Sequence, residues 1–122
     1  MDRDWLRTVL EHARGLVLQG WTQGNFTRGY GRMQTWCMWG AIVRANAVVR
    51  GARITKTEER DIEMVFRHRT RGSIIDFNDA PRRTQGEVVA AFDAVLASLS
   101  EPAPERLLSD APEQVPVVVS AG

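Results

Sequence analysis

The sequence predicts an all-α fold: a small single-domain bundle of about four helices, with a long Gly- and aromatic-rich loop and a Pro-rich C-terminal tail. Three observations indicate this fold. Apolar residues recur at helical spacing in several segments, residues suited to helix capping precede most of them, and the stretches between them are rich in glycine or proline. The 122 residues, 43% hydrophobic and 25% charged, have the size and composition of one soluble domain.

The first helix is expected from about Asp4 to Leu18, where apolar residues recur every three or four positions. Asp2 or Asp4 can cap its start, and Gly20 can end it. Gly15 lies inside this helix and weakens it by about 1 kcal/mol relative to alanine. The residues expected on its buried face are Leu6, Val9, Leu10, Ala13, Leu16 and Val17.

Residues 20–34 contain four glycines and show no hydrophobic period, so they are expected to form a loop. A loop of this length in a compact domain is often functional or disordered. The second helix is expected from about Thr35 to Val49. It is apolar nearly all round, which indicates a buried helix at the centre of the bundle. Gly40 is expected to let another backbone approach closely.

The third helix is expected to begin with Thr55 or Thr57 as its cap and to end at Gly72. Thr55 and Glu58 have the spacing of a capping box, in which each side chain bonds the other residue's backbone N–H. Acidic residues lie near the start of this helix and basic residues near its end, which suits the helix dipole.

Residues 73–83 form a second special connection, in which Ile74, Ile75 and Phe77 are expected to point inward. Asparagine and aspartate within it favour a turn, because their side chains bond nearby backbone groups. This connection is expected to meet the 20–34 loop at one end of the bundle.

The fourth main helix is expected from about Gln85 to Leu99, where Thr84 and Glu87 repeat the capping-box spacing. Residues 1–100 are therefore expected to form the helical domain. Residues 101–122 contain four prolines and a valine strip, and are expected to form an acidic tail that is flexible or bound to a partner.

Charge is distributed unevenly along the chain. Residues 1–83 hold 15 of the 16 basic residues and 9 of the 15 acidic ones, a net charge of +6. No acidic residue occurs between Glu11 and Glu58. An arginine-rich, basic body with an acidic end predicts an acidic partner for the body, or an intramolecular match.

The sequence offers no recognisable catalytic or metal-binding set, and no cofactor is expected. Cys37 is the only cysteine and lies in the most apolar segment, so it is expected to pack as a small hydrophobic residue. Only two histidines are present, too few for a metal site without a carboxylate cluster. The charged N-terminus precedes no long apolar run, so neither a signal peptide nor a membrane span is expected and the cytoplasm is the predicted compartment.

The candidate binding residues come from the two special connections. Trp21 could anchor a partner, or it could close the end of the bundle with Gln23 bonded to loop backbone. Asn78 and Asp79 could place an amide and a carboxylate in a pocket, or they could form the turn that Pro81 terminates. The full set of candidate binding residues is Trp21, Gln23, Arg28, Arg32, Asn78, Asp79 and Arg83.

Three short motifs occur in a fixed order: GWTQG at 20–24, WCxxGA at 36–41 and NDAPxRT at 78–84. Together they resemble a small domain family of unknown function that is encoded by actinobacteria and their phages. The resemblance covers about residues 5–99, although Phe77 stands where a Trp usually precedes Asn-Asp. It implies a helical cytoplasmic domain from an actinobacterium or a phage, and it implies no reaction.

The leading functional hypothesis is a non-enzymatic interaction or regulatory protein. It would bind a host or regulatory protein through an aromatic and cationic surface. Two alternatives from other classes are a nucleic-acid-binding accessory protein, which the arginines favour, and a small enzyme that uses the Asn78-Asp79 turn. A homodimer is a further alternative, because an apolar second helix needs more cover than three neighbours easily give.

Overall fold

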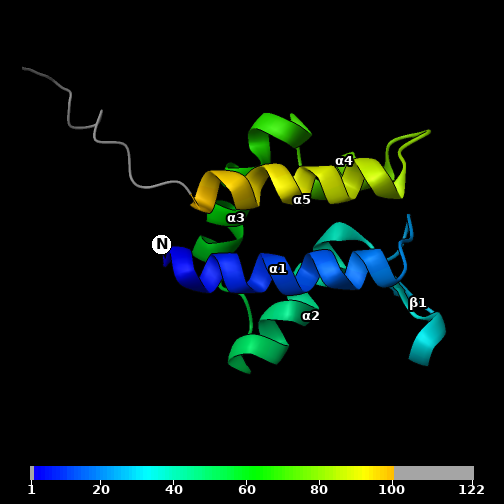
Figure 1. Cartoon of the computed structure of the whole chain (residues 1–122), viewed down its shortest axis with the longest axis horizontal. Helices are drawn as coiled ribbons and strands as arrows, with labels where there is room; N and C mark the ends of the chain where they lie inside the picture. The colour runs from blue at the N-terminus through cyan, green and yellow to red at the C-terminus, as the bar shows by residue number, and fades with distance from the viewer. Residues whose placement is uncertain (1, 101–122) are drawn as a thin grey trace, which may run out of the picture.

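The computed structural model describes residues 2–100. The fold is all-α, as the sequence predicts, with a small two-stranded sheet at one end (Figure 1). Residues 101–122, for which a tail is predicted, lie outside the described residues. In chain order the elements are α1 (Arg3–Gln19), β1 (Thr27–Arg28), a 3₁₀ turn η1 (Gly31–Met33), β2 (Thr35–Trp36), α2 (Met38–Arg50), α3 (Lys56–Thr70), α4 (Ile74–Asp79) and α5 (Gln85–Ser100).

The central helix is α1, which packs against α2 on one side and α5 on the other (Figure 1). The expectation that the second helix lies at the centre is therefore wrong. The buried stripe of α1 has no exposed surface and consists of Leu6, Val9, Leu10, Ala13 and Val17. Phe66 of α3 meets Phe92 of α5 edge to face, with ring centroids 5.5 Å apart, and this contact joins α3 to the same core.

The predicted caps are present at three helix starts. Asp2 Oδ1 accepts hydrogen bonds from the backbone N–H groups of Asp4 and Trp5, at 3.0 and 3.1 Å. Thr55 and Glu58 form the complete capping box of α3. The capping box before α5 is also complete, and its two hydrogen bonds join Thr84 and Glu87. These hydrogen bonds satisfy N–H groups that the first turn of a helix leaves without partners.

The second helix differs from the prediction in its start and in its burial. Thr35 and Trp36 are extended, because Trp36 N donates to Gly20 O at 2.9 Å and so joins the chain that leaves α1. The start of α2 is therefore Met38, three residues later than expected. One face of α2 packs inward, but Val43 and Val48 are 43% and 52% exposed, so this helix is not buried all round.

The connection over residues 73–83 contains a helix that the sequence did not predict. Ser73 caps α4 by accepting a hydrogen bond from Asp76 N at 3.0 Å. Ile74 is fully buried and Phe77 is half-buried, but Ile75 is 38% exposed, so the prediction that all three point inward is wrong for Ile75. The described region thus has five helices, of which α4 has only six residues.

Different parts of the chain lie near the two ends of α1. At its start, the guanidinium groups of Arg3 and Arg7 donate to Leu99 O, at 2.9 and 3.0 Å. The start of α1 therefore lies beside the end of α5 (Figure 1). Beyond the far end of α1 lie the sheet and η1 (Figure 1).

Gly40 in the first turn of α2 lies directly beneath the backbone of Phe26. Phe26 O accepts a hydrogen bond from Cys37 N at 3.0 Å. A Cβ added to Gly40 would lie 2.2 Å from that same carbonyl oxygen. The close backbone approach predicted for Gly40 is therefore present, and only glycine leaves room for it.

Two glycine-to-alanine substitutions inside helices should have opposite effects. Gly40→Ala should lower the free energy of unfolding by about 1–3 kcal/mol, because its methyl group overlaps the Phe26 carbonyl. Gly15→Ala should raise it by about 1 kcal/mol, because the added Cβ in α1 would meet no atom within 4 Å beyond its chain neighbours and the backbone of its own helix. Urea denaturation of both variants and the wild type measures the two changes. Equal effects of the two substitutions would contradict this account.

Candidate functional site

The buried amide of Asn78 lies where the 20–34 and 73–83 segments meet. Asn78 lies on α4 and has no exposed surface. Its Oδ1 accepts hydrogen bonds from Trp21 Nε1 at 2.7 Å and from Met38 N at 3.0 Å. Its Nδ2 donates to Thr22 O at 3.1 Å and to Asp79 Oδ1 at 2.9 Å. Both lone pairs and both N–H groups of the amide are therefore in use.

Further hydrogen bonds join the same two segments. Gln23 Nε2 donates to Asn78 O at 2.9 Å and to Ala80 O at 3.0 Å. Asp79 Oδ1 also accepts from Gly24 N at 3.0 Å. The prediction that the 20–34 and 73–83 segments meet at one end of the bundle is confirmed.

Arg83 fixes the chain between α4 and α5. Its Nε donates to Phe77 O at 2.8 Å, and its guanidinium carbon lies 3.7 Å from the centroid of the Phe77 ring. Its Nη1 lies 3.6 Å from Glu87 Oε1. The guanidinium thus stacks on an aromatic face while it spans two helices.

Four of the seven predicted site residues therefore belong to one network, formed by Trp21, Gln23, Asn78 and Asp79, and Arg83 bonds Phe77, the residue before Asn78. We call it the Asn78 network. It holds the fold together: Trp21 packs against the core, and every hydrogen-bonding position of the Asn78 amide is taken. Arg28 and Arg32 are not part of it. They lie exposed on the segment that carries β1 and η1.

The chemistry available around the Asn78 network is limited. Cys37 is buried, and its Sγ accepts a hydrogen bond from Gly40 N at 3.3 Å at the start of α2. Burial raises the pKa of the Cys37 thiol above its usual value, which disfavours a nucleophilic thiolate. Cys37 and Asp79 line a cavity of only about 70 Å³. Within residues 2–100 no three histidine, cysteine or acidic side chains are grouped as metal ligands would be.

A short hairpin extends from the Asn78 network. Strand β1 pairs antiparallel with β2, with Thr27 opposite Trp36 and Arg28 opposite Thr35. Thr27 Oγ1 donates to Thr35 O at 2.8 Å across the pair. Gly29 and Gly31 have φ angles of +71° and +60°, which other residues rarely adopt. Residues 26–36 thus form a defined hairpin rather than the irregular loop that the sequence predicted.

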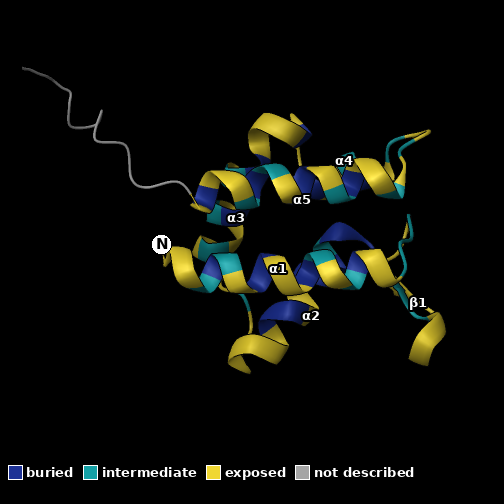
Figure 2. Cartoon of the chain, viewed as in Figure 1, coloured by how far each residue is buried: buried dark blue, intermediate teal, exposed yellow. Residues whose placement is uncertain are grey.

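The hairpin presents large apolar side chains to solvent. The exposed fractions of Phe26, Tyr30 and Met33 are 54%, 86% and 79%. Figure 2 shows the tip of this hairpin fully exposed, in contrast to the buried faces of α1 and α2. Sequence reasoning did not select these three residues. The glycines at positions 29 and 31 allow the turn around Tyr30, and they are the sequence signal that could have identified this exposed tip.

The comparisons with known proteins identify the family. A family model described as "Family of unknown function (DUF6197)" matches residues 1–98. The chain belongs to DUF6197. The match spans all three motifs, so the residues of the Asn78 network lie within the family domain. No curated protein and no solved structure matches the chain.

Among the described residues of this DUF6197 domain, no helix has both the length and the apolar character needed to cross a membrane.

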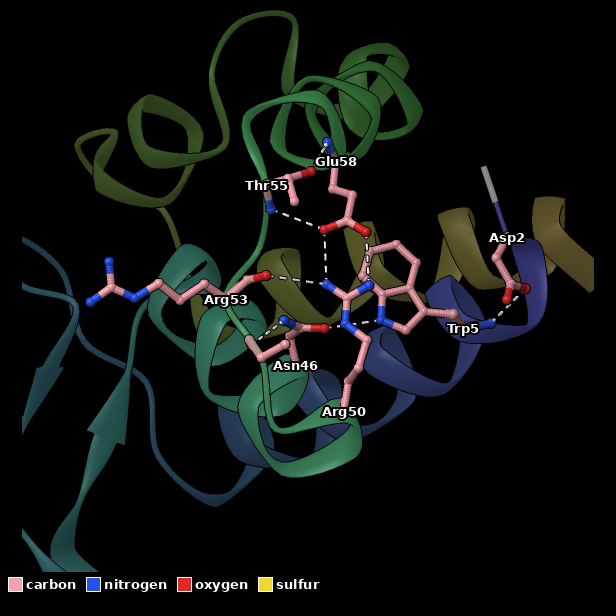
Figure 3. Close-up of polar contacts among 8 residues, drawn as sticks. Asp2, Trp5, Asn46, Arg50, Arg53, Thr55 and Glu58 are labelled. Atoms are coloured by element: carbon pink, nitrogen blue, oxygen red, sulfur yellow. Dashed lines mark hydrogen bonds and ion pairs between the residues drawn. The ribbon is translucent and has the colours of Figure 1, made fainter.

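A second polar network lies at the other end of α2 (Figure 3). Trp5 Nε1 donates to Asn46 Oδ1 at 2.9 Å, and Asn46 Nδ2 donates to Ala52 O at 2.7 Å. Asn46 has no exposed surface, so these bonds compensate the burial of its amide.

An ion pair completes this second network. Arg50 and Glu58 form two hydrogen bonds of 2.8 Å, and the Arg50 guanidinium lies 4.7 Å from the Trp5 ring centroid (Figure 3). The hydrogen bond from Arg50 has the largest effect on the pKa of Glu58, and the bond from Thr55 N adds to it. Together they lower this pKa to about 2. The bonds connect α1, α2 and α3, which indicates a structural role.

Asn78→Ala should lower the free energy of unfolding by about 2–4 kcal/mol, because it leaves the Trp21 and Met38 N–H groups buried without acceptors. Chemical denaturation followed by tryptophan fluorescence measures this loss. Asn25→Ala is the control: it removes an exposed asparagine of the same segment and should change stability by less than about 0.5 kcal/mol. Equal stability of the two variants would show that Asn78 is not a structural centre.

The Arg50–Glu58 pair should make stability depend on acid pH. The pKa of Glu58 in the folded protein is about 2, below the ordinary value of 4.5, so the pair stabilises the fold above pH 4.5. That contribution should disappear as the pH falls from 4.5 to 2. Glu58→Gln keeps a residue suited to the capping box but does not titrate. The stability difference between wild type and Glu58→Gln should therefore shrink over this range, and a constant difference would contradict the ion-pair assignment.

Proposed function

We propose that this DUF6197 domain is a non-enzymatic protein-binding module that engages its partner through the 26–36 hairpin. The observation that carries the proposal is the exposure of Phe26, Tyr30 and Met33 on one short hairpin. Arg28 and Arg32 lie on the same hairpin. Large apolar side chains rimmed by cations have the composition of a protein interface, in which a few aromatic anchors supply most of the affinity.

The way the hairpin is held supports this function. Its base is fixed by the Trp36 bond to Gly20 O and by the Cys37 bond to Phe26 O. The Asn78 network holds the residues on both sides of it, from Trp21 to Met38. A binding surface that is ordered before association loses less conformational entropy when the partner binds. Met33 adds a side chain that adapts readily to an irregular partner surface.

The charge of the hairpin indicates the kind of partner. No acidic residue occurs between Glu11 and Glu58, so Arg28 and Arg32 are the only charged residues of the hairpin. The expected partner is a host or regulatory protein whose surface has an apolar depression surrounded by acidic residues. Both proteins would act in the cytoplasm of an actinobacterium, whether the bacterium or a phage encodes this chain. Nucleic-acid binding is the alternative, and the exposed arginines at the end of α3 favour it. The small-enzyme alternative uses Asn78 and Asp79, whose side chains already bond the fold itself.

The Tyr30→Ala/Met33→Ala double variant should lose partner capture without losing stability, because both side chains are largely exposed. The measurement is affinity capture from actinobacterial lysate, with and without nuclease, followed by mass spectrometry. Leu18→Ala/Met64→Ala is the matched control, since it removes two exposed apolar side chains from α1 and α3.

A protein retained by wild type and control but lost with the double variant, in both nuclease arms, supports the proposal. Retention by the hairpin variant would place the binding surface elsewhere. Retention that disappears with nuclease would favour the nucleic-acid alternative.

A further inference from the structure

A cavity of about 220 Å³ opens between α3, the end of α4 and α5, and it shares no residue with the hairpin. Two arginines line it, one from α3 and one from the segment before α5. Apolar atoms of one aromatic ring and two alanines form much of the remaining lining. The residues that line it are Arg69, Phe77, Arg83, Glu87, Ala90 and Ala91.

Both arginines retain hydrogen-bonding capacity. Arg83 is held by Phe77 O through Nε and lies near Glu87 through Nη1, but its Nη2 has no hydrogen-bond partner among residues 2–100. The Arg69 side chain forms neither a hydrogen bond nor an ion pair with another residue of that range, and it is exposed. The cavity therefore offers one fixed and one adjustable guanidinium.

The backbone beside this cavity contains two arginines in an unusual conformation. Arg71 and Arg82 have φ angles of +57° and +64°, a region in which glycine is far more favourable. Arg71 follows Arg69 by two residues, and Arg82 directly precedes Arg83. Arg71 is the residue that ends α3, a position at which the left-handed conformation is common. Four arginines thus concentrate at the two chain segments that border the cavity.

We propose that this cavity binds a phosphate monoester carried on a small apolar or aromatic body. Guanidinium groups match the geometry of phosphate oxygens and can bond two of them at once. The Arg83 guanidinium already covers one face of the Phe77 ring, so Ala90, Ala91 and the remaining atoms of the ring that line the cavity provide an apolar surface for the rest of the ligand. The volume is below that of a cavity for a drug-sized molecule, so the ligand is small or is a single modified side chain. Glu87 opposes the anion and moderates its affinity.

Phenyl phosphate is the probe, titrated into the full chain and followed by calorimetry and by NMR. Arg69→Gln should weaken its binding by about tenfold, the order expected for one charge-assisted hydrogen bond. Glu87→Gln should strengthen binding, because it removes the opposing charge while glutamine still suits the capping box with Thr84. Arg60→Gln, an exposed arginine of α3 that does not line the cavity, is the charge control and should leave the affinity unchanged.

Two further ligands distinguish the sources of the phosphate group. A phosphotyrosyl peptide that binds much more tightly than phenyl phosphate would identify a modified protein as the source, and equal affinities would identify a small phosphate ester. Benzoate should bind more weakly than phenyl phosphate. The proposal is overturned if phenyl phosphate does not bind the wild type, if Arg60→Gln weakens binding as much as Arg69→Gln, or if benzoate binds as tightly.

Discussion

A side-chain amide that is removed from water can form four hydrogen bonds, and in this domain the buried amide of Asn78 forms all four. Its partners come from the strand-like segment after α1, the first turn of α2 and its own neighbour Asp79. The partner farthest from it in the chain is Trp21, which lies 57 positions before Asn78. Because the Trp21 and Met38 N–H groups have Asn78 Oδ1 as their acceptor, the position of α4 is tied to the segment after α1 and to the start of α2. The three short motifs of this chain therefore have a structural explanation.

The same constraint determines how the hairpin is presented. Met38 N is bonded to Asn78, and one residue earlier Cys37 N is bonded to Phe26 O. The chain can pass that close to α2 only because residue 40 has no side chain. The buried network and the exposed hairpin are thus two parts of one arrangement. The shape of the exposed hairpin therefore depends on residues that are buried in the Asn78 network.

The sequence was sufficient where structure depends on local interactions. Periodicity and capping residues identified α1, α3 and α5 closely, and the capping boxes formed as expected. It was insufficient where distant backbone groups decide the outcome: Trp36 is extended because it bonds Gly20, and α4 is too short to show a period. For the site, the meeting of the two special segments could be predicted. Which aromatic residues face solvent could not, because Trp21 is held inward by a residue 57 positions away, whereas Tyr30 lies at the tip of a two-residue strand pairing.

The contacts of Arg3 and Arg7 with Leu99 have a practical consequence for the architecture. A chain that enters at α1 and leaves after α5 does so on one side of the domain, while the hairpin projects beyond the other end of α1 (Figure 1). A helix of 17 residues separates these two sides by about 25 Å. The domain can therefore be fused, tethered to a surface or inserted into another protein through residues 3 and 99. Each of these attachments leaves Tyr30 and Met33 accessible.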